Sequence, residues 1–346
     1  MSFHPEDQGV LYLATNSGGI YKSQNSGRTW QEINTGFPNS QARFILSNPK
    51  YTDQVIVAGE NGIYLSPNGG NTWEAAQHDW INGTDIKQII ASPIESSTLY
   101  ALGLFRPLNT NSLLNNSIVL LKSYDSGNSW SFQELDLPGS GSAVMAIHPS
   151  NIETVFIGTS NGLFSSTDSG KSWVRSEGDI WENATIEAIA IDPVNADTLY
   201  VSVSRFITNN HGGFDVTGDI IKSMDGGNSW NTSSMGLNTT QAFGTVVVNS
   251  LDPDIVYLLT REDGIYISVN QGDDWNLLPI KTPYQPEDPA NHEPTPQPTT
   301  TIPATTPSPQ NPSSNGNFAI WILVISGALV ITGIIFIVLK TAKSKY

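Results

Sequence analysis

Six short segments of the chain place an acidic or amide side chain between a serine and a glycine, in the pattern Ser-x-Asp/Asn-x-Gly, with a tryptophan three residues later. The Asp/Asn position is occupied, in chain order, by Asn25, Asn68, Asp125, Asp168, Asp225 and Asn270. An aspartate could act as a general acid, a general base or a metal ligand. Asparagine keeps the acceptor oxygen but cannot ionise, so half of the copies could not perform this chemistry. We therefore interpret all six side chains as structural.

Two tryptophans outside these segments could contact a sugar. Trp80 follows Asp79, and Trp181 lies between Asp179 and Glu182. An exposed indole ring can stack on a sugar while carboxylates hold its hydroxyls. Two carboxylates roughly 5 to 10 Å apart could also hydrolyse a glycosidic bond, so the three acidic residues are catalytic candidates. The alternative is that both rings are buried and pin long loops to the protein.

Four of the six arginines are candidates for binding an anionic or polar ligand: Arg43, Arg106, Arg205 and Arg261. For Arg106 and Arg205 a structural salt bridge with Asp215 or Asp219 is the alternative. The five histidines show no metal-ligand spacing, and no glycine-rich phosphate loop is present. We expect neither a metal nor a cofactor.

The same frame of short apolar runs surrounds every motif. In one repeat it reads Ile189-Ala-Ile-Asp-Pro193, Thr198-Leu-Tyr-Val201 and Ile220-Ile-Lys-Ser223 before the motif. Runs rich in Val, Ile and Tyr that are broken by Asp-Pro, Asn-Gly and Gly-Gly predict strands joined by tight turns. Each repeat thus predicts four strands, with the motif as the hairpin between the third and the fourth. The fourth strand begins at the motif tryptophan, which is Trp30, Trp73, Trp130, Trp173, Trp230 or Trp275.

A repeat of about 40 to 50 residues that forms one small sheet predicts a β-propeller, because each sheet must bury its faces against its neighbours. We expect an all-β domain at residues 1–280, with blades at about 1–36, 37–80, 81–137, 138–178, 179–235 and 236–280. The longer blades carry their extra residues between the second and third strands, at Gly103–Ser117 and Ser204–Asp219. That connection opens on the face opposite the motif turns. The candidate tryptophans and arginines are expected on this same face.

The motif resembles the Asp-box, or bacterial neuraminidase, repeat of sialidases, sortilin-type receptors, xyloglucanases and photosystem II assembly factors. The resemblance covers about residues 1–280 and implies that the Asp-box turns lie on the outer, bottom side, away from the ligand-binding face. A sialidase would have an early Arg-Ile-Pro signature, from which Arg43-Phe-Ile-Leu46 departs. No arginine follows Arg261 to complete an arginine triad. Sialidase activity is therefore not expected.

The composition of the chain indicates how the fold is stabilised, which partners are disfavoured and where the protein lies. The chain has no cysteine, so stability must come from strand pairing and stacked blades. Its 32 acidic residues against 16 basic ones give a net charge of −16, which disfavours nucleic-acid binding. Residues 318–339 carry no charge and would span about 33 Å as a helix, which predicts one transmembrane helix. The basic tail at residues 340–346 predicts a cytoplasmic C-terminus, with the propeller outside the cytoplasm.

Residues 281–317 are rich in proline and threonine and predict a disordered stalk. At the other end, Phe3-His4-Pro5 aligns with the first strand of later repeats. We therefore expect further N-terminal residues in the complete protein, which would supply a signal peptide and a strand that closes the ring. Whether they also add a seventh blade to the six visible ones is open.

The preferred interpretation is a membrane-tethered propeller that binds a polysaccharide or protein through the face opposite the Asp boxes, without catalysis. The alternative is a glycoside hydrolase resembling the xyloglucanases. A further alternative is an assembly factor for a membrane complex, although the photosystem factors use an arginine-rich patch and this chain has only six arginines.

Overall fold

The computed structural model describes residues 1–15, 19–38, 42–48, 50–59, 62–76, 84–105, 117–138, 143–209 and 211–279. The predicted stalk, membrane span and basic tail lie outside these residues. In the described part of the chain, no helix has both the length and the apolar character that a membrane crossing requires.

Six antiparallel sheets of four strands each make up this region. Blade 1 holds β1 (Ser2–Phe3), β2 (Leu11–Ala14), β3 (Ile20–Ser23) and β4 (Gln31–Glu32). Blade 2 holds β5 (Ala42–Ser47), β6 (Val55–Gly59), β7 (Gly62–Ser66) and β8 (Glu74–Ala75). Blade 3 holds β9 (Thr84–Ala91), β10 (Leu99–Phe105), β11 (Ser117–Ser123) and β12 (Ser131–Leu135).

The second half of the chain repeats this pattern. Blade 4 holds β13 (Ala143–Ile147), β14 (Val155–Thr159), β15 (Gly162–Ser166) and β16 (Val174–Arg175). The single-turn 3-10 helix η1 (Asp179–Trp181) leads into blade 5, with β17 (Ala184–Ile191), β18 (Leu199–Thr208), β19 (Phe214–Ser223) and β20 (Asn231–Thr232). Blade 6 holds β21 (Phe243–Val248), β22 (Val256–Thr260), β23 (Ile265–Ser268) and β24 (Asn276–Leu277).

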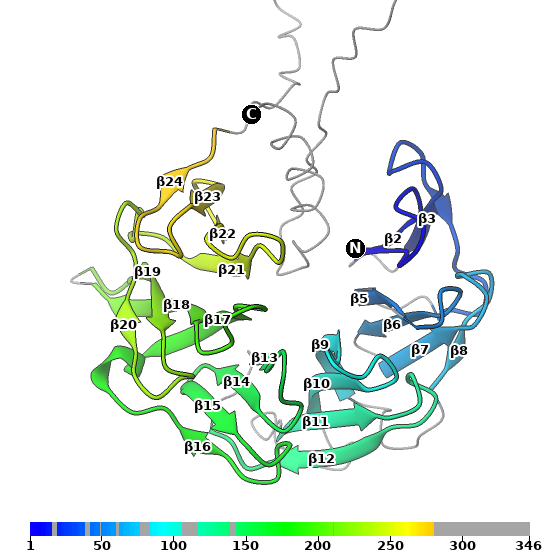
Figure 1. The fold of residues 1–346 in the computed structure, drawn as a ribbon, viewed down its shortest axis with the longest axis horizontal. Coiled ribbons are helices and arrows are strands. Elements are labelled where there is room, and N and C mark those ends of the chain that lie inside the picture. Colours follow the sequence, from blue (N-terminus) through cyan, green and yellow to red (C-terminus); the bar gives the residue numbers. More distant parts are fainter. Residues whose placement is uncertain are drawn as a thin grey trace, which may run out of the picture. The chain divides into compact units, whose positions relative to one another are not determined.

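The sheets follow one another in chain order around a common centre (Figure 1). In each sheet the first strand lies innermost and the fourth outermost, because the strands pair in sequence order. Consecutive first strands lie against each other, as in the pairs β5 and β9, β13 and β17, and β17 and β21. This arrangement confirms the predicted all-β repeat of six four-stranded sheets and is consistent with a six-bladed propeller.

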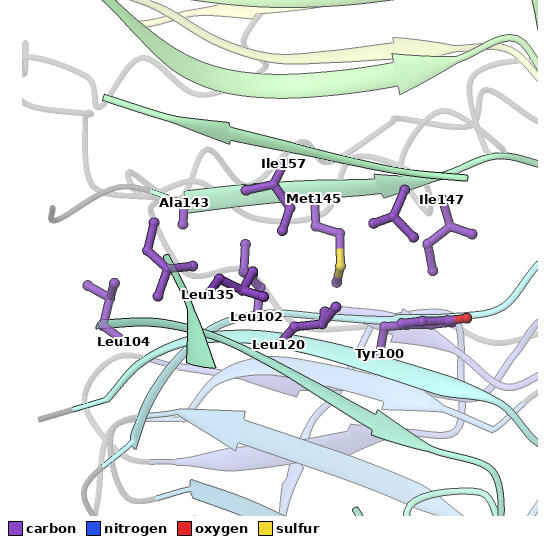
Figure 2. Packing of buried hydrophobic residues seen from close by; sticks show 11 residues of the cluster. Tyr100, Leu102, Leu104, Leu120, Leu135, Ala143, Met145, Ile147 and Ile157 are labelled. Carbon is purple, nitrogen blue, oxygen red and sulfur yellow. The ribbon is translucent and has the colours of Figure 1, made fainter. Parts of the chain in front are cut away.

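The core lies between the blades. Figure 2 shows one such layer, where side chains of blade 3 face side chains of blade 4. Blade 3 supplies Tyr100, Leu102, Leu104, Leu120 and Leu135, and blade 4 supplies Ala143, Met145, Ile147 and Ile157. Because each central strand has a neighbouring blade on both faces, strands such as β6 and β14 are apolar and buried along their whole length.

The Asp-box side chains form the hydrogen bonds of their own turns. Ser123 Oγ accepts a hydrogen bond from Gly127 N at 2.7 Å and donates one to Asp125 Oδ1 at 2.8 Å. Asp125 Oδ1 also accepts from Ser129 N at 2.8 Å. Gly127 has φ 91°, a left-handed conformation that glycine adopts without strain. The other five turns repeat the bond to the serine and the bond to the Asp or Asn oxygen.

The two ends of the blades carry different connections, because successive strands run antiparallel. The Asp-box turns lie at one end, together with the turns between first and second strands. We call this end the box face. The turns between second and third strands and the links from one blade to the next lie at the other end, which we call the upper face. Each innermost strand therefore begins at the upper face.

Candidate binding site at the inner rim

Three innermost strands are interrupted near their upper ends by one residue that the hydrogen-bonded ladder skips. The skipped residues are Arg43 in β5, Lys87 in β9 and Glu187 in β17. Such bulges locally bend a strand and re-aim a side chain, and they are frequent beside binding sites. In β21 the register also shifts, between Phe243 and Val246. We call the beginnings of β5, β9, β17 and β21 the inner rim.

A cluster of three charges joins blades 2 and 3 at this rim. Arg43 Nη1 pairs with Asp85 Oδ1, and Lys87 Nζ lies 2.6 Å from Asp85 Oδ2. The three side chains are 26%, 23% and 29% exposed for Arg43, Lys87 and Asp85. Burial raises the pKa of Asp85, but hydrogen bonds and positive charges from Arg43 and Lys87 outweigh it, so this pKa lies below its ordinary value. Among the described residues, the cluster thus places two cationic side chains on one carboxylate.

A second charged pair lies at the rim between blades 5 and 6. Burial raises the pKa of Glu187 above its ordinary value, against a hydrogen bond with Ser204 and the positive charge of Arg261, which both lower it. Arg261 belongs to the turn between β22 and β23, and its backbone N donates to Ala242 O at 3.2 Å. Glu187 is thus partly withdrawn from water, within range of the positive charge of Arg261.

Of the four predicted arginines, Arg43 lies at the inner rim, and Arg261 lies beside the rim in the turn between β22 and β23. Their partners Asp85, Lys87 and Glu187 were not predicted. The signal was present, because Thr84-Asp-Ile-Lys-Gln88 and Thr185-Ile-Glu187 interrupt strands that are otherwise apolar. Each of these charges falls where the period of two expects a polar residue, so it indicates a position that faces water but does not reveal the bulge.

Arg205 takes part in contacts within its own blade. Its Nη1 lies 2.5 Å from Asp219 Oδ2, and its Nη2 donates to Ile180 O at 2.6 Å. The guanidinium therefore holds the β18–β19 hairpin against η1, which is the structural role considered for it above. The hairpin formed by the predicted insertion is long, since β18 and β19 have 10 residues each, against 5 for β14 and β15.

Trp181 is buried, with 1% of its side chain exposed. Its ring packs edge to face against Trp230, with centroids 5.2 Å apart and planes at 83°. The ring is not presented for stacking on a sugar, and this geometry favours the anchoring alternative. The flanking Asp179 and Glu182 are exposed, and Glu182 N donates to Asp179 O at 3.0 Å. Trp80, Asp79 and Arg106 lie outside the described residues.

In the described part of the chain, no three His, Asp or Glu side chains come together as ligands of a metal ion. Hydrogen bonds from side chains to main-chain atoms also join neighbouring blades. Gln88, for example, donates from Nε2 to Met145 O at 3.0 Å and accepts from Met145 N at 2.6 Å. These contacts make the inner rim a rigid support for its charged groups.

Comparison with known proteins finds the same fold at low sequence identity. No family model matches the chain. The xyloglucanase of Hypocrea jecorina (strain QM6a) is 22% identical over 290 residues, which cover 80% of this chain and 25% of that protein. The chain thus spans about a quarter of the length of this curated relative.

Solved structures agree with this likeness. An ancestral GH74 enzyme is 20% identical and superposes with a TM-score of 0.64, covering 76% of this chain and 35% of the enzyme. YCF48 from Cyanidioschyzon merolae is 14% identical with a TM-score of 0.53, covering 80% of this chain and 83% of its own. Together with the six four-stranded sheets, these likenesses show that the described residues adopt the β-propeller fold, in a form similar to the propellers of GH74 enzymes and YCF48.

Proposed function

We propose that this propeller is a non-catalytic binding module that takes a glycan or a protein segment on its upper face. We further propose that the stalk at 281–317 and the span at 318–339 hold it outside the cytoplasm, at the cell membrane. The xyloglucanase relative has a polysaccharide substrate by its name, which supports a glycan as the first ligand class to test. An assembly factor would use the same face to dock a protein.

The observation that carries the proposal is the charged cluster of Arg43, Lys87 and Asp85. The chain has a net charge of −16, yet among the described residues this point of the inner rim brings two cationic side chains to one carboxylate. A guanidinium and an ammonium on neighbouring strands suit a carboxylate or sulfate group. We therefore expect an acidic polysaccharide to bind better than a neutral one.

The long hairpin of blade 5 adds a second contact region on the upper face. Phe206, Ile207 and Phe214 are 52%, 51% and 69% exposed. Phe206 pairs with Val216 and Phe214 pairs with Thr208, so both phenylalanines lie on one face of the hairpin. Exposed aromatic side chains beside polar groups are typical of ligand-contacting surfaces.

A polysaccharide array tests the proposal. The purified full-length chain should retain at least one acidic polysaccharide, and Lys87→Gln should weaken that binding about tenfold. Arg28→Gln is the matched control, because Arg28 is an exposed arginine in an Asp-box turn. Equal losses in both variants, or binding of neutral polysaccharides only, would argue against the inner rim as the site.

A glycoside hydrolase is the second candidate, favoured by one observation. Burial raises the pKa of Glu187, which lies in the first strand of blade 5, and a raised pKa is what the general acid of a glycosidase requires. This function would be established if the full-length chain releases reducing ends from xyloglucan. The release should be lost in Glu187→Gln and kept in Glu177→Gln. Unchanged polysaccharide after prolonged incubation would favour the binding module.

Membrane fractionation tests the tether. The full-length chain should remain with membranes after alkaline carbonate extraction, and a chain that ends at Asn317 should not. Release of the full-length chain by carbonate would exclude a membrane span at 318–339.

A further inference from the structure

A polar hollow lies on the upper face between blades 4 and 5, away from the inner rim. Its volume is about 330 Å³, and it is lined by Pro138, Ser160, Asn161, Arg175, Trp181, Glu182 and Asn183. Ser160 and Asn161 form the turn between β14 and β15, whereas the last three belong to η1 and its link to β17. Arg175 comes from the outermost strand β16. Together with Pro138 from the link between β12 and β13, four separate segments thus meet around one small space.

The Arg175 guanidinium is held in a defined orientation. Its Nε and Nη2 both donate to Asn161 O, each at 3.1 Å. These two bonds use one edge of the planar group. The Nη1 hydrogens and the second Nη2 hydrogen remain on the other edge, which is the edge that forms paired hydrogen bonds with a carboxylate. The main chain of the β14–β15 turn therefore preorganises a carboxylate-binding fork.

The Trp181 indole adds an unsatisfied donor. Its Nε1 is buried and has no hydrogen-bond partner among the described residues. By contrast, Trp130, Trp173 and Trp230 donate from Nε1 to the carbonyl of the box glycine three residues earlier. A buried N–H without a partner costs about 1–3 kcal/mol, so it is rarely left unpaired. Trp181 lines the hollow, but its Nε1 is closed to solvent, so a ligand oxygen would pair with it only after a shift of the lining side chains.

Glu182 supplies the opposite charge. Neither Glu182 nor Arg175 forms an ion pair with another residue in the described ranges, although both line the hollow. A ligand with negative charge alone would be repelled by Glu182, and one with positive charge alone would be repelled by Arg175. A group that carries both charges would satisfy both side chains.

We propose that this hollow binds the α-amino carboxylate group of an amino acid, with the carboxylate on Arg175 and the ammonium on Glu182. Trp181 forms part of the lining, so its indole resonance should respond to the bound molecule. The volume lies at the small end of the range for ligand sites, which suits one amino acid rather than an extended chain. The site shares no residue with the inner rim, so this inference stands independently of the proposed function.

Selective ¹⁵N labelling of the tryptophan indoles in the full-length chain provides the test. Glycine and serine should shift one indole resonance, which Trp181→Phe identifies by its disappearance. Acetate alone and methylamine alone should bind at least tenfold more weakly, because each satisfies one charge. Arg175→Gln and Glu182→Gln should each weaken glycine binding at least tenfold. Both side chains are exposed, so the melting temperature should stay unchanged.

Arg28→Gln and Glu177→Gln serve as controls, because both side chains are exposed and neither lines the hollow. They should bind glycine like the parent chain. Acetate binding as tight as glycine binding, or full glycine binding in Glu182→Gln, would overturn the zwitterion assignment. The absence of any indole shift at 50 mM glycine would overturn the site itself. Polysaccharide binding by the same samples reports separately on the inner rim.

Discussion

Arg43 and Asp85 form an ion pair that joins the innermost strands of blades 2 and 3, and Lys87 closes on the same carboxylate from the bulge of β9. The pair joins the two blades at the inner rim, where Lys87 adds a second cationic side chain to the same carboxylate. Because Arg43 is itself the skipped residue of β5, the backbone irregularity and the charge coincide at one position. That coincidence distinguishes the rim from the rest of the blades.

The ion pairs of Asp85 predict a pH-dependent contribution to stability. Since the pKa of Asp85 in the folded protein lies below its ordinary value of 3.8, the stabilisation is present above pH 3.8 and is lost as the pH falls through the folded-state pKa. Asp85→Asn should cost about 1 kcal/mol at pH 7, and less below pH 4. Urea denaturation of both chains at pH 7 and pH 3 measures the difference. An equal cost at both pH values would show that the ion pairs contribute no stability.

Glu187 should show the opposite pH dependence. Its folded-state pKa is raised above the ordinary value of 4.5, so its protonated form is favoured in the folded protein. That contribution is present below pH 4.5 and is lost as the pH rises through the folded-state pKa. Glu187→Gln should therefore gain stability relative to the parent chain between pH 4 and pH 7. Denaturation midpoints that keep a constant difference over this range would contradict the burial of Glu187.

The Asp-box carboxylates should tolerate amidation but not truncation. Asp125 accepts from Ser129 N, whereas Asn25 accepts from Thr29 N and donates from Nδ2 to Thr29 Oγ1 at 2.8 Å. Asn therefore preserves the main bond and reverses only the side-chain one. Asp125→Asn should change the unfolding free energy by less than about 0.5 kcal/mol, and Asp125→Ala should lower it by about 1–2 kcal/mol.

Calorimetry of these two variants gives the ranking directly. Equal destabilisation by Asn and Ala would mean that the negative charge matters rather than the acceptor oxygen. Polysaccharide binding should be the same in both variants, because Asp125 lies on the box face. A loss of affinity with an intact fold would place a ligand on that face.

Trp181 should behave as a core residue. Its 1% exposure and its edge-to-face contact with Trp230 predict that Trp181→Ala lowers the unfolding free energy by about 3–5 kcal/mol. Val174→Ala is the control, since this side chain is 69% exposed and should have little effect. A melting temperature that is unchanged in Trp181→Ala would mean that the ring is not packed as described.

The repeated four-stranded sheet was predictable because every unit contains the same local sequence signals. The alternation of apolar residues, the turn glycines and the tryptophan recur six times, so the six four-stranded sheets follow from the sequence. The structural role of the Asp/Asn position could also be predicted, because three copies of the motif have asparagine there and three have aspartate. Both predictions rest on the local sequence of one repeat and do not require the contacts between blades.

The site was only partly predictable, because its contacts join residues that are distant in the sequence. Arg43 and Asp85 come from different blades, and a bulge is invisible in a pattern that still alternates on both sides of it. The hollow likewise brings together Pro138, Arg175 and Trp181 through the packing of two blades. For Trp181, residue type suggested a stacking surface, whereas its burial depends on Trp230, about 50 residues away.

The central claim, that ligands bind at the inner rim, is tested most directly by an amide hydrogen-exchange footprint of the full-length chain with and without polygalacturonate, a polysaccharide of carboxylate-bearing sugars. Protection is expected at the beginnings of β5 and β9, where Arg43, Asp85 and Lys87 lie, with no change at the six Asp-box turns. Protection confined to the Asp-box turns, or no protection at a concentration that saturates binding, would contradict the account.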